Sequence, residues 1–225
     1  MQIRINKVSV ISEDKLILDD ITTDLNKKRT GIIGCNGSGK STFLRLLNGL
    51  VIPDLGTVTI NGCDTKNNLK QVRKNVGFLF QNPEHQIIMP TVSEDLLLGL
   101  KALDLSMVEK KRKLEEIVEK FKISQLVDQS SHSLSGGEKQ LVALAAIMIT
   151  SPKILICDEP TTLLDFRNKN LLINYLLELD CNLILVSHDL DHFNSFDELI
   201  LFNEGKIVAK GLPNLIINKY LDIVS

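Results

Sequence analysis

Residues 30–50 read TGIIGCNGSGKSTFLRLLNGL, and this stretch decides the fold. Its first residues favour a strand, and the residues after Ser41 carry the apolar spacing of a helix. Between them, residues 34–41 satisfy the pattern Gly-x-x-x-x-Gly-Lys-Ser, in which glycine lets backbone N–H groups close around phosphate oxygens. The segment therefore predicts the strand, phosphate-binding loop (P-loop) and helix of an α/β nucleotide-binding core.

The loop residues carry the chemistry of a nucleoside triphosphate site. Lys40 neutralises charge on the β- and γ-phosphates, and the Ser41 hydroxyl is an oxygen ligand of the kind that Mg²⁺ accepts. The residues expected to contact the nucleotide are Gly34, Asn36, Gly37, Ser38, Gly39, Lys40, Ser41 and Thr42.

Runs of branched residues predict further strands. We expect them at residues 3–11, 57–60, 76–80, 154–157, 183–186 and 198–202, with a last strand and a short helix after residue 206. The runs at 154–157 and 183–186 are apolar on both faces, as in a parallel sheet covered by helices. From Pro90 the strands stop, and a capping box at residues 91–94 begins a helical region. The sequence predicts one domain over residues 1–225, with an α/β core at 1–89 and 152–225 and a helical insert at 90–151.

Composition excludes several classes of protein. The 225 residues have a net charge of −2 without a strong cluster of Lys or Arg, so the electrostatic footprint of a nucleic-acid binder is missing. The four cysteines are widely spaced, which fits neither a zinc motif nor a disulfide framework. The longest clean apolar run, residues 141–149, is about half of the roughly 20 residues that span a membrane. We expect a cytoplasmic chain that reaches a membrane only through partners.

Two carboxylates follow the predicted strand at residues 154–157. Asp158 and Glu159 stand at its carboxyl end, where open α/β sheets bind ligands. Adjacent side chains on an extended backbone point in different directions, so one carboxylate can hold Mg²⁺ while its neighbour polarises an attacking water.

Two further polar residues also follow predicted strands. The amide oxygen of Gln81 could reach Mg²⁺ and water, and His188 could hydrogen-bond a γ-phosphate. Taken alone, a Gln before Asn-Pro is more often a turn residue and a lone histidine is usually structural. Spacing predicts no role for His85, His132 or His192.

A second glycine-rich helix start, LSGGEKQ, occupies residues 134–140. Ser135 and Glu138 form a capping box, but Gly136 and Gly137 weaken a first helical turn and are not needed for capping. Exposed N–H groups with little side-chain cover make an anion site. A second anion site far along the chain suggests that two copies share each nucleotide.

Together these motifs resemble, over essentially the whole chain, the ATP-binding subunits of ATP-binding-cassette (ABC) transporters. The Walker A motif (residues 34–41), Q-loop (Gln81), signature (134–140), Walker B motif (154–159), D-loop (Asp165) and switch histidine (His188) occur in the family's order. The resemblance implies the ABC ATPase architecture, which is a RecA-like P-loop NTPase core with an antiparallel β subdomain and a helical insert. It also implies a head-to-tail dimer holding two ATP molecules, each between the P-loop of one copy and Ser135, Gly136, Gly137 and Asp165 of the other.

The same resemblance implies roles for the polar residues. Glu159 would be the catalytic base and His188 the γ-phosphate sensor, while Ser41, Gln81 and Asp158 would form the Mg²⁺ environment.

Residues 80–96, FQNPEHQIIMPTVSEDL, are similar to the segment that follows the Q-loop in energy-coupling-factor ATPases. Those enzymes serve importers of vitamins and of cobalt or nickel ions, and the segment (Gln81 to Leu96) faces the coupling helices of a transmembrane subunit. The resemblance implies a peripheral ATPase on the cytoplasmic face of the membrane that reaches the substrate-binding subunit indirectly. Biotin, cobalt or nickel are the first solutes to consider, because the chain stops soon after residues 211–213, as the shorter subunits of those systems do.

Other readings stay open. A soluble ABC ATPase of translation or DNA repair generally has two cassettes or a long insertion, for which 225 residues leave no room. A P-loop small-molecule kinase would not need the motif at residues 134–140. The ATPase subunit of another class of ABC importer would need it, so that class remains an alternative. A homodimer is favoured, and pairing with a paralogue is the alternative.

The chain departs from the family's pattern at a few positions. Residues 10–12 contain no aromatic to stack on adenine, so we expect modest discrimination between ATP and GTP. Glu138 replaces the more frequent Gln and Leu141 the common Arg, and we expect neither to touch the Ser/Gly anion site directly. Leu163 stands where the D-loop usually has a small residue, which bears on the fit of two copies. Cys35 inside the P-loop predicts thiol-sensitive activity.

Overall fold

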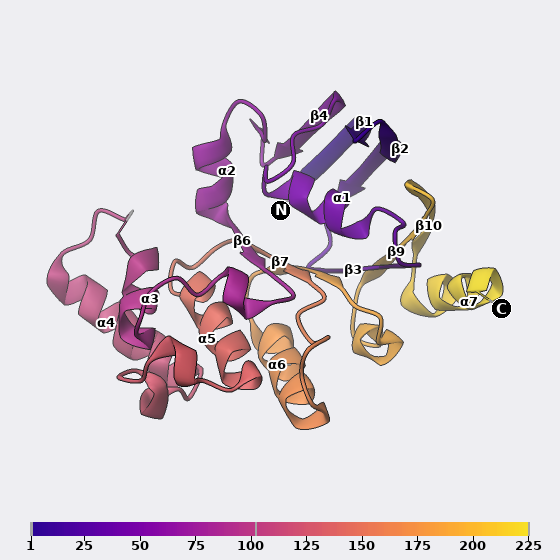
Figure 1. Ribbon diagram of the computed structural model, residues 1–225. Coiled ribbons are helices and arrows are strands. Elements are labelled where there is room, and N and C mark those ends of the chain that lie inside the picture. The colour runs from indigo at the N-terminus through magenta and orange to yellow at the C-terminus, as the bar shows by residue number, and fades with distance from the viewer. Residues whose placement is uncertain (1, 102, 225) are drawn as a thin grey trace. The chain divides into compact units, whose positions relative to one another are not determined.

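The computed structural model describes residues 2–101 and 103–224, and the chain divides into two compact units (Figure 1). The first unit comprises Met1–Gly77, Lys153–Glu159 and Cys181–Ser225. The second comprises Phe78–Pro152 and Pro160–Asp180. The predicted helical insert, residues 90–151, falls within the second unit, which also includes residues 78–89 and 160–180.

An antiparallel sheet of four strands belongs to the first unit, in the order β2-β1-β4-β5. Its strands are β1 (Ile3–Ser12), β2 (Lys15–Leu25), β4 (Leu55–Ile60) and β5 (Cys63–Asp64). Strand β2 was not predicted from the sequence. Asp19 and Asp20 interrupt its branched residues, Asp20 has a φ of 48°, and the register against β1 shifts three times. Each such irregularity breaks the alternation by which a half-buried strand is recognised.

The second sheet has the strand order β10-β9-β3-β8-β7-β6. Its strands are β3 (Arg29–Gly34), β6 (Val76–Leu79), β7 (Ile154–Asp158), β8 (Asn182–Val186), β9 (Glu198–Asn203) and β10 (Lys206–Gly211). Strand β3 pairs in parallel with β8 and β9, β7 pairs in parallel with β8, and β10 is antiparallel to β9. All five residues of β7 are buried, which confirms the predicted parallel core. Of β6, Val76 and Gly77 belong to the first unit.

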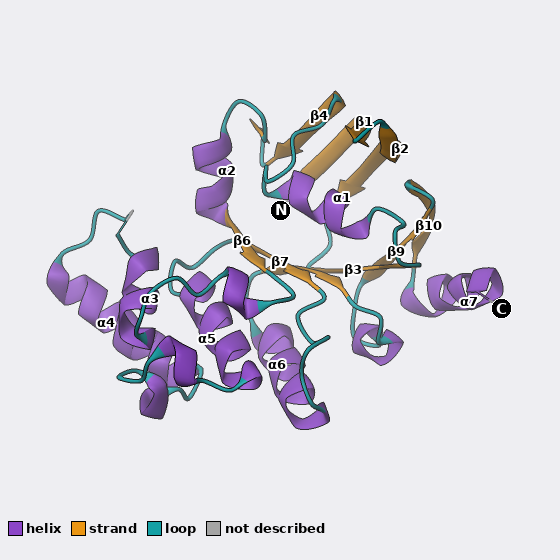
Figure 2. Cartoon of the chain, viewed as in Figure 1, coloured by secondary structure: helices purple, strands orange, loops and turns teal. Residues whose placement is uncertain are grey.

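The helix after the P-loop, α1 (Lys40–Leu47), contacts strands of both sheets in the first unit, and Figure 2 shows it between them. Phe43 of α1 is fully buried and its ring centroid lies 5.0 Å from that of Phe202 in β9. This packing fixes the start of α1 above the ends of the parallel strands. The other helical segments of this unit are α2 (Leu69–Asn75), the short 3₁₀ helix η4 (Leu190–Phe193) and α7 (Pro213–Val224), which packs on β9 and β10.

The second unit is helical. It contains α3 (Val92–Gly99), α4 (Met107–Lys120), α5 (Gly136–Met148), α6 (Phe166–Glu178) and the 3₁₀ helices η1 (Pro83–His85), η2 (Ser124–Leu126) and η3 (Ser131–Ser133). Helix α5 contacts η1, α3, α4 and α6, so it forms the centre of this unit. Capping boxes begin α3, α4 and α5. Within residues 2–101 and 103–224, no helix has the length and apolar composition needed to cross a bilayer.

Candidate functional site

The P-loop connects the end of β3 to the start of α1, and its residues line a cavity of about 290 Å³. Gly34 and Gly39 have φ angles of 146° and 97°, which favour glycine. A Cβ atom at Gly34 would lie 2.2 Å from the Phe202 carbonyl oxygen, so no other residue fits there. The cavity is lined by Ile17, Asn36, Gly37, Ser38, Gly39, Lys40, Ser41, Thr42 and Glu159.

Lys40 supplies a buried cation to this cavity. Its side chain donates hydrogen bonds of 2.8 Å from Nζ to the carbonyl oxygens of both Gly34 and Cys35, and the residue is 5% exposed. Burial lowers the pKa of Lys40, and the carboxylate of Glu159 opposes that effect. An anion entering the loop therefore finds a positive charge that has already lost most of its water.

Ser41 and Asp158 form a pair of oxygen donors beside Lys40. Ser41 Oγ donates to Asp158 Oδ1 at 2.9 Å, and Asp158 is 7% exposed at the end of β7. Burial raises the pKa of Asp158, and the bond from Ser41 partly offsets the shift. A hydroxyl and a carboxylate are hard oxygen ligands, so this pair fits Mg²⁺, whose charge would relieve the cost of burying the carboxylate.

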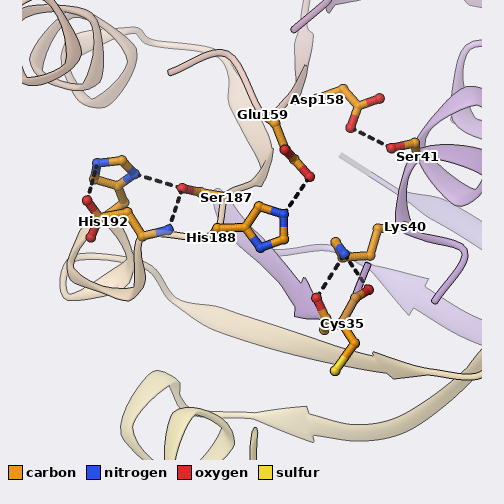
Figure 3. Close-up of polar contacts among 10 residues, drawn as sticks. Cys35, Lys40, Ser41, Asp158, Glu159, Ser187, His188 and His192 are labelled. Atoms are coloured by element: carbon orange, nitrogen blue, oxygen red, sulfur yellow. Dashed lines mark hydrogen bonds and ion pairs between the residues drawn. The ribbon is translucent and has the colours of Figure 1, made fainter. Parts of the chain in front are cut away.

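Glu159 turns away from Asp158, as the sequence predicts for adjacent residues at a strand end. Its φ of 48° places it in the left-handed region, where a non-glycine residue costs on the order of 1–3 kcal/mol. Its side chain meets His188, with Oε1 and Nε2 at 2.9 Å (Figure 3). His188 is 43% exposed, so the pair stands at the surface of the first unit.

In the second unit, the signature residues begin α5. Ser135 is the N-cap, and its Oγ and N–H donate to Glu138 Oε2 at 2.6 and 2.8 Å. These bonds lower the pKa of Glu138. The prediction that Glu138 does not touch the anion site directly was therefore wrong, because the capping box folds this side chain back onto the serine.

The two signature glycines differ in whether the structure has room for a side chain at their position. A Cβ at Gly136 would meet nothing within 4 Å, whereas one at Gly137 would lie 2.5 Å from the side chain of Asn168 in α6. Asn168 donates from its N–H and Nδ2 to the carboxylate of Asp165, which caps α6. Asn168 thus connects Gly137 of the signature with Asp165 of the D-loop inside the second unit. Its role was not predicted, although Asp165-x-x-Asn168 is a capping pattern.

Gln81 follows β6 in the second unit and is exposed. The residue before it, Phe80, accepts a 3.0 Å hydrogen bond on its carbonyl oxygen from Nε2 of Gln140. Gln140 is 1% exposed and is the last residue of the signature motif. This hydrogen bond therefore joins the signature motif to the residue that precedes the Q-loop glutamine. Residues 60 positions apart make this contact, which no local pattern predicts.

Ile17 also lines the P-loop cavity, at a point where β2 is irregular. Val10 pairs with Leu18 and Ile11 with Leu16, so Ile17 is an extra residue in the strand. An aliphatic side chain offers neither an aromatic face nor a hydrogen bond with which to distinguish purine bases.

We expect the ratio of ATP to GTP hydrolysis, measured as kcat/KM, to stay below about a hundredfold, some 2.7 kcal/mol. Phosphate contacts supply most of the binding and are the same for both nucleotides. A larger preference would show that the chain recognises the base by contacts other than those expected here.

Cys35 is partly exposed in the P-loop, and its peptide oxygen holds Lys40. We expect alkylation to remove most of the ATPase activity, because the adduct crowds the loop, and we expect bound ATP to protect. The measurement is residual activity after N-ethylmaleimide treatment. Cys63 is also partly exposed, so Cys63→Ser is the matched control and should remain sensitive, whereas a Cys35→Ser enzyme that is still inhibited would contradict the prediction.

Comparison with known proteins gives consistent matches. The sequence profile described as "ABC transporter" matches residues 18–162. The chain is 39% identical over 225 residues to the biotin transport ATP-binding protein BioM of Rhizobium etli, covering 100% of both chains. It is 40% identical to the energy-coupling factor transporter ATP-binding protein EcfA2 of Caldanaerobacter subterraneus, covering 95% of this chain and 80% of that protein. Among solved structures, cbiO1 of Clostridium perfringens, described as part of the ABC transporter complex cbiONQ, superimposes with a TM-score of 0.86 at 26% identity, covering 97% of this chain and 92% of that one.

Proposed function

Because this chain belongs to the ABC transporter family of ATP-binding proteins, we propose that it powers an importer of the energy-coupling-factor type. ABC ATP-binding subunits hydrolyse ATP to drive transport, and this chain is such an ATPase. The observation that carries the proposal is the convergence, in one unit, of the Lys40 cation, the Ser41–Asp158 pair and the Glu159–His188 pair. The importer type rests on residues 80–96 and on the full-length match to a protein named for biotin transport.

Different residues of the first unit would take different roles in ATP hydrolysis. The P-loop N–H groups and Lys40 bind the phosphates of ATP, and Ser38, whose Oγ is buried without a partner among the described residues, offers a further hydrogen bond. Ser41 and Asp158 would hold Mg²⁺, which neutralises phosphate charge when bound. Glu159 accepts the proton of the attacking water, and His188 donates a hydrogen bond to the γ-phosphate.

A second copy would complete each nucleotide site. Ser135 and Gly136 are exposed at the start of α5. The Ser135 hydroxyl and N–H donate to Glu138 in the single chain, so an anion brought by another chain would have to replace that carboxylate as their acceptor. We propose a head-to-tail dimer in which these residues, with Gly137 and Asp165, close over ATP bound to the partner's P-loop. The partner is a second copy of this chain, with a paralogue as the alternative.

The segment after the Q-loop offers a surface for a membrane subunit. In the second unit, a cavity of about 310 Å³ is lined by Glu84, Ile87, Ile88, Met89, Ser131, His132 and Lys139. Lys139 pairs with Glu84 at 2.7 Å along this cavity, and the Ile88 side chain is 74% exposed. An apolar anchor beside a charged pair suits a helix of a transmembrane coupling subunit. The chain would then work at the cytoplasmic face of the membrane, with no nucleic-acid partner, and contact the solute-binding subunit only indirectly.

Ile88→Lys tests this surface and the importer assignment. We expect detergent-solubilised membrane subunits that copurify with the wild-type chain to be lost, since removing an apolar anchor weakens an interface by about 10- to 100-fold. ATP hydrolysis by the isolated chain should be unchanged. Met107→Lys is the control, because Met107 is 80% exposed on α4 and does not line the cavity.

The identity of the copurified proteins decides between the alternatives. Integral membrane subunits of an uptake system, together with ATP-dependent uptake of biotin, cobalt or nickel in reconstituted vesicles, would support the proposal. Ribosomal or DNA-repair proteins in their place would contradict it.

A further inference from the structure

His188 is presented by a short loop between β8 and η4. Its side chain is 43% exposed and reaches Glu159 at 2.9 Å. An exposed imidazole gains little positional restraint from packing. Its geometry relative to Glu159 therefore depends on how firmly the residues on either side of it, Ser187 and Asp189, are held.

One buried imidazole, that of His192, reaches both of these neighbours (Figure 3). Its Nδ1 lies 3.0 Å from Ser187 Oγ, and its Nε2 lies 3.6 Å from Asp189 Oδ2. The N–H of Asp189 in turn donates to Ser187 Oγ at 3.1 Å. Ser187 and His192 are 4% and 8% exposed, so their hydrogen bond is shielded from water, whereas the Asp189 side chain is 32% exposed.

The directions of these bonds are mutually consistent. Because Ser187 Oγ already accepts from the Asp189 N–H, its own proton is available to His192 Nδ1. The Nε2 atom can then carry the imidazole proton and face the Asp189 carboxylate, at a distance longer than a hydrogen bond. The Ser187 hydroxyl thus has both a donor, the Asp189 N–H, and an acceptor, His192 Nδ1.

The short helix that carries His192 is anchored to the sheet. Asp189 caps η4 by accepting from the Asp191 N–H at 3.2 Å. The next residue, Phe193, is fully buried, and its ring approaches Gly31 of β3 so closely that a Cβ there would lie 2.5 Å from it. Since β3 leads directly into the P-loop, His192 links the loop bearing His188 to the strand that bears the phosphate site.

We propose that His192 is a positioning residue for ATP hydrolysis, acting through Ser187 and Asp189 on His188. This inference rests on the proposed function, because it concerns the rate of that same reaction. Through its contacts with Ser187 and Asp189, His192 fixes the backbone from which His188 projects.

The test is ATP hydrolysis and ATP binding by His192→Ala and His192→Asn, each alone and with His188→Ala. His192→Ala should lower kcat about tenfold, equivalent to about 1.4 kcal/mol, with the Kd for ATP changed less than about twofold. An Asn side chain can replace Nδ1 as a partner of Ser187, so His192→Asn should recover kcat to within about threefold of wild type. Because the effect passes through His188, His192→Ala should change the residual rate of His188→Ala by less than about twofold.

Two control variants make the result decisive. Asn194→Ala removes an exposed side chain at the end of the same short helix and should behave as wild type. Ser187→Ala breaks the same link without touching His192, so it should lower kcat and should not add to His192→Ala. It also replaces His192→Ala if that variant does not fold.

The inference is overturned if kcat is unchanged, if kcat and ATP affinity fall together, or if His192→Ala is equally harmful without His188. A wild-type chain that does not hydrolyse ATP at all would instead refute the proposed function.

Discussion

Glu159→Gln will bind ATP as the wild type does and lose nearly all turnover. Glutamine keeps the size of the side chain and its contact with His188, but its amide cannot accept the proton of the attacking water. Loss of a general base lowers the rate of a chemical step by about 10²- to 10⁴-fold. The measurement is single-turnover hydrolysis of ATP alongside its Kd.

The same variant should accumulate as an ATP-dependent dimer, because hydrolysis no longer opens it. Size-exclusion chromatography with and without MgATP will show this shift. Glu204→Gln is the matched control, since Glu204 is an exposed glutamate of the same unit with a φ of 47°. If Glu159→Gln hydrolyses ATP at the normal rate, the base is another group.

Lys40→Ala will lose ATP binding by at least about a hundredfold, some 2.7 kcal/mol. The ammonium is the buried positive charge of the P-loop cavity, and its removal also deletes the two hydrogen bonds that it donates to the carbonyl oxygens of Gly34 and Cys35. Isothermal titration calorimetry will measure the loss directly. In thermal unfolding, MgATP at 100 times the wild-type Kd should stabilise the wild type by about 2.7 kcal/mol and the variant by less than about 0.5 kcal/mol.

The nucleotide-free variant should remain folded. Burial lowers the pKa of Lys40, which means that the buried charge costs folding free energy at neutral pH. Removing that cost offsets the lost hydrogen bonds, so loss of binding is not secondary to unfolding. Lys206→Ala, which removes an exposed lysine paired with Asp19, is the control and should bind ATP normally.

Local sequence patterns predicted the elements whose defining residues lie within a few positions of one another. The P-loop was found because its glycines and its Lys-Ser pair stand in a fixed register between a strand and a helix. Strands β7 and β8, predicted at residues 154–157 and 183–186, were found because a buried strand is apolar on both faces. Capping boxes at Thr91 and Ser135 predicted where α3 and α5 begin, because the hydrogen bonds of a capping box join residues only three positions apart.

Irregular elements escaped prediction. Strand β2 contains bulges and paired aspartates, so its alternation is broken. The cap of helix α6 was not predicted either, although Asp165 and Asn168 stand three residues apart just before the apolar residues of that helix. The capping box at residues 135–138 was predicted, but its consequence was not drawn: the Glu138 carboxylate bonds the Ser135 hydroxyl, which was expected to be free of this departure from the family's pattern.

The sequence by itself determined the chemistry of this protein, because an ATP site needs particular residue types at short fixed spacings. Only the tertiary structure decided how those residues are supported. Gln140 holds Phe80 across 60 residues, Asn168 packs on Gly137, and Phe193 places the His192 imidazole beside the loop of His188 by packing on Gly31. Such contacts join segments that are distant along the chain, and their geometry follows from strand order and close packing rather than from local spacing.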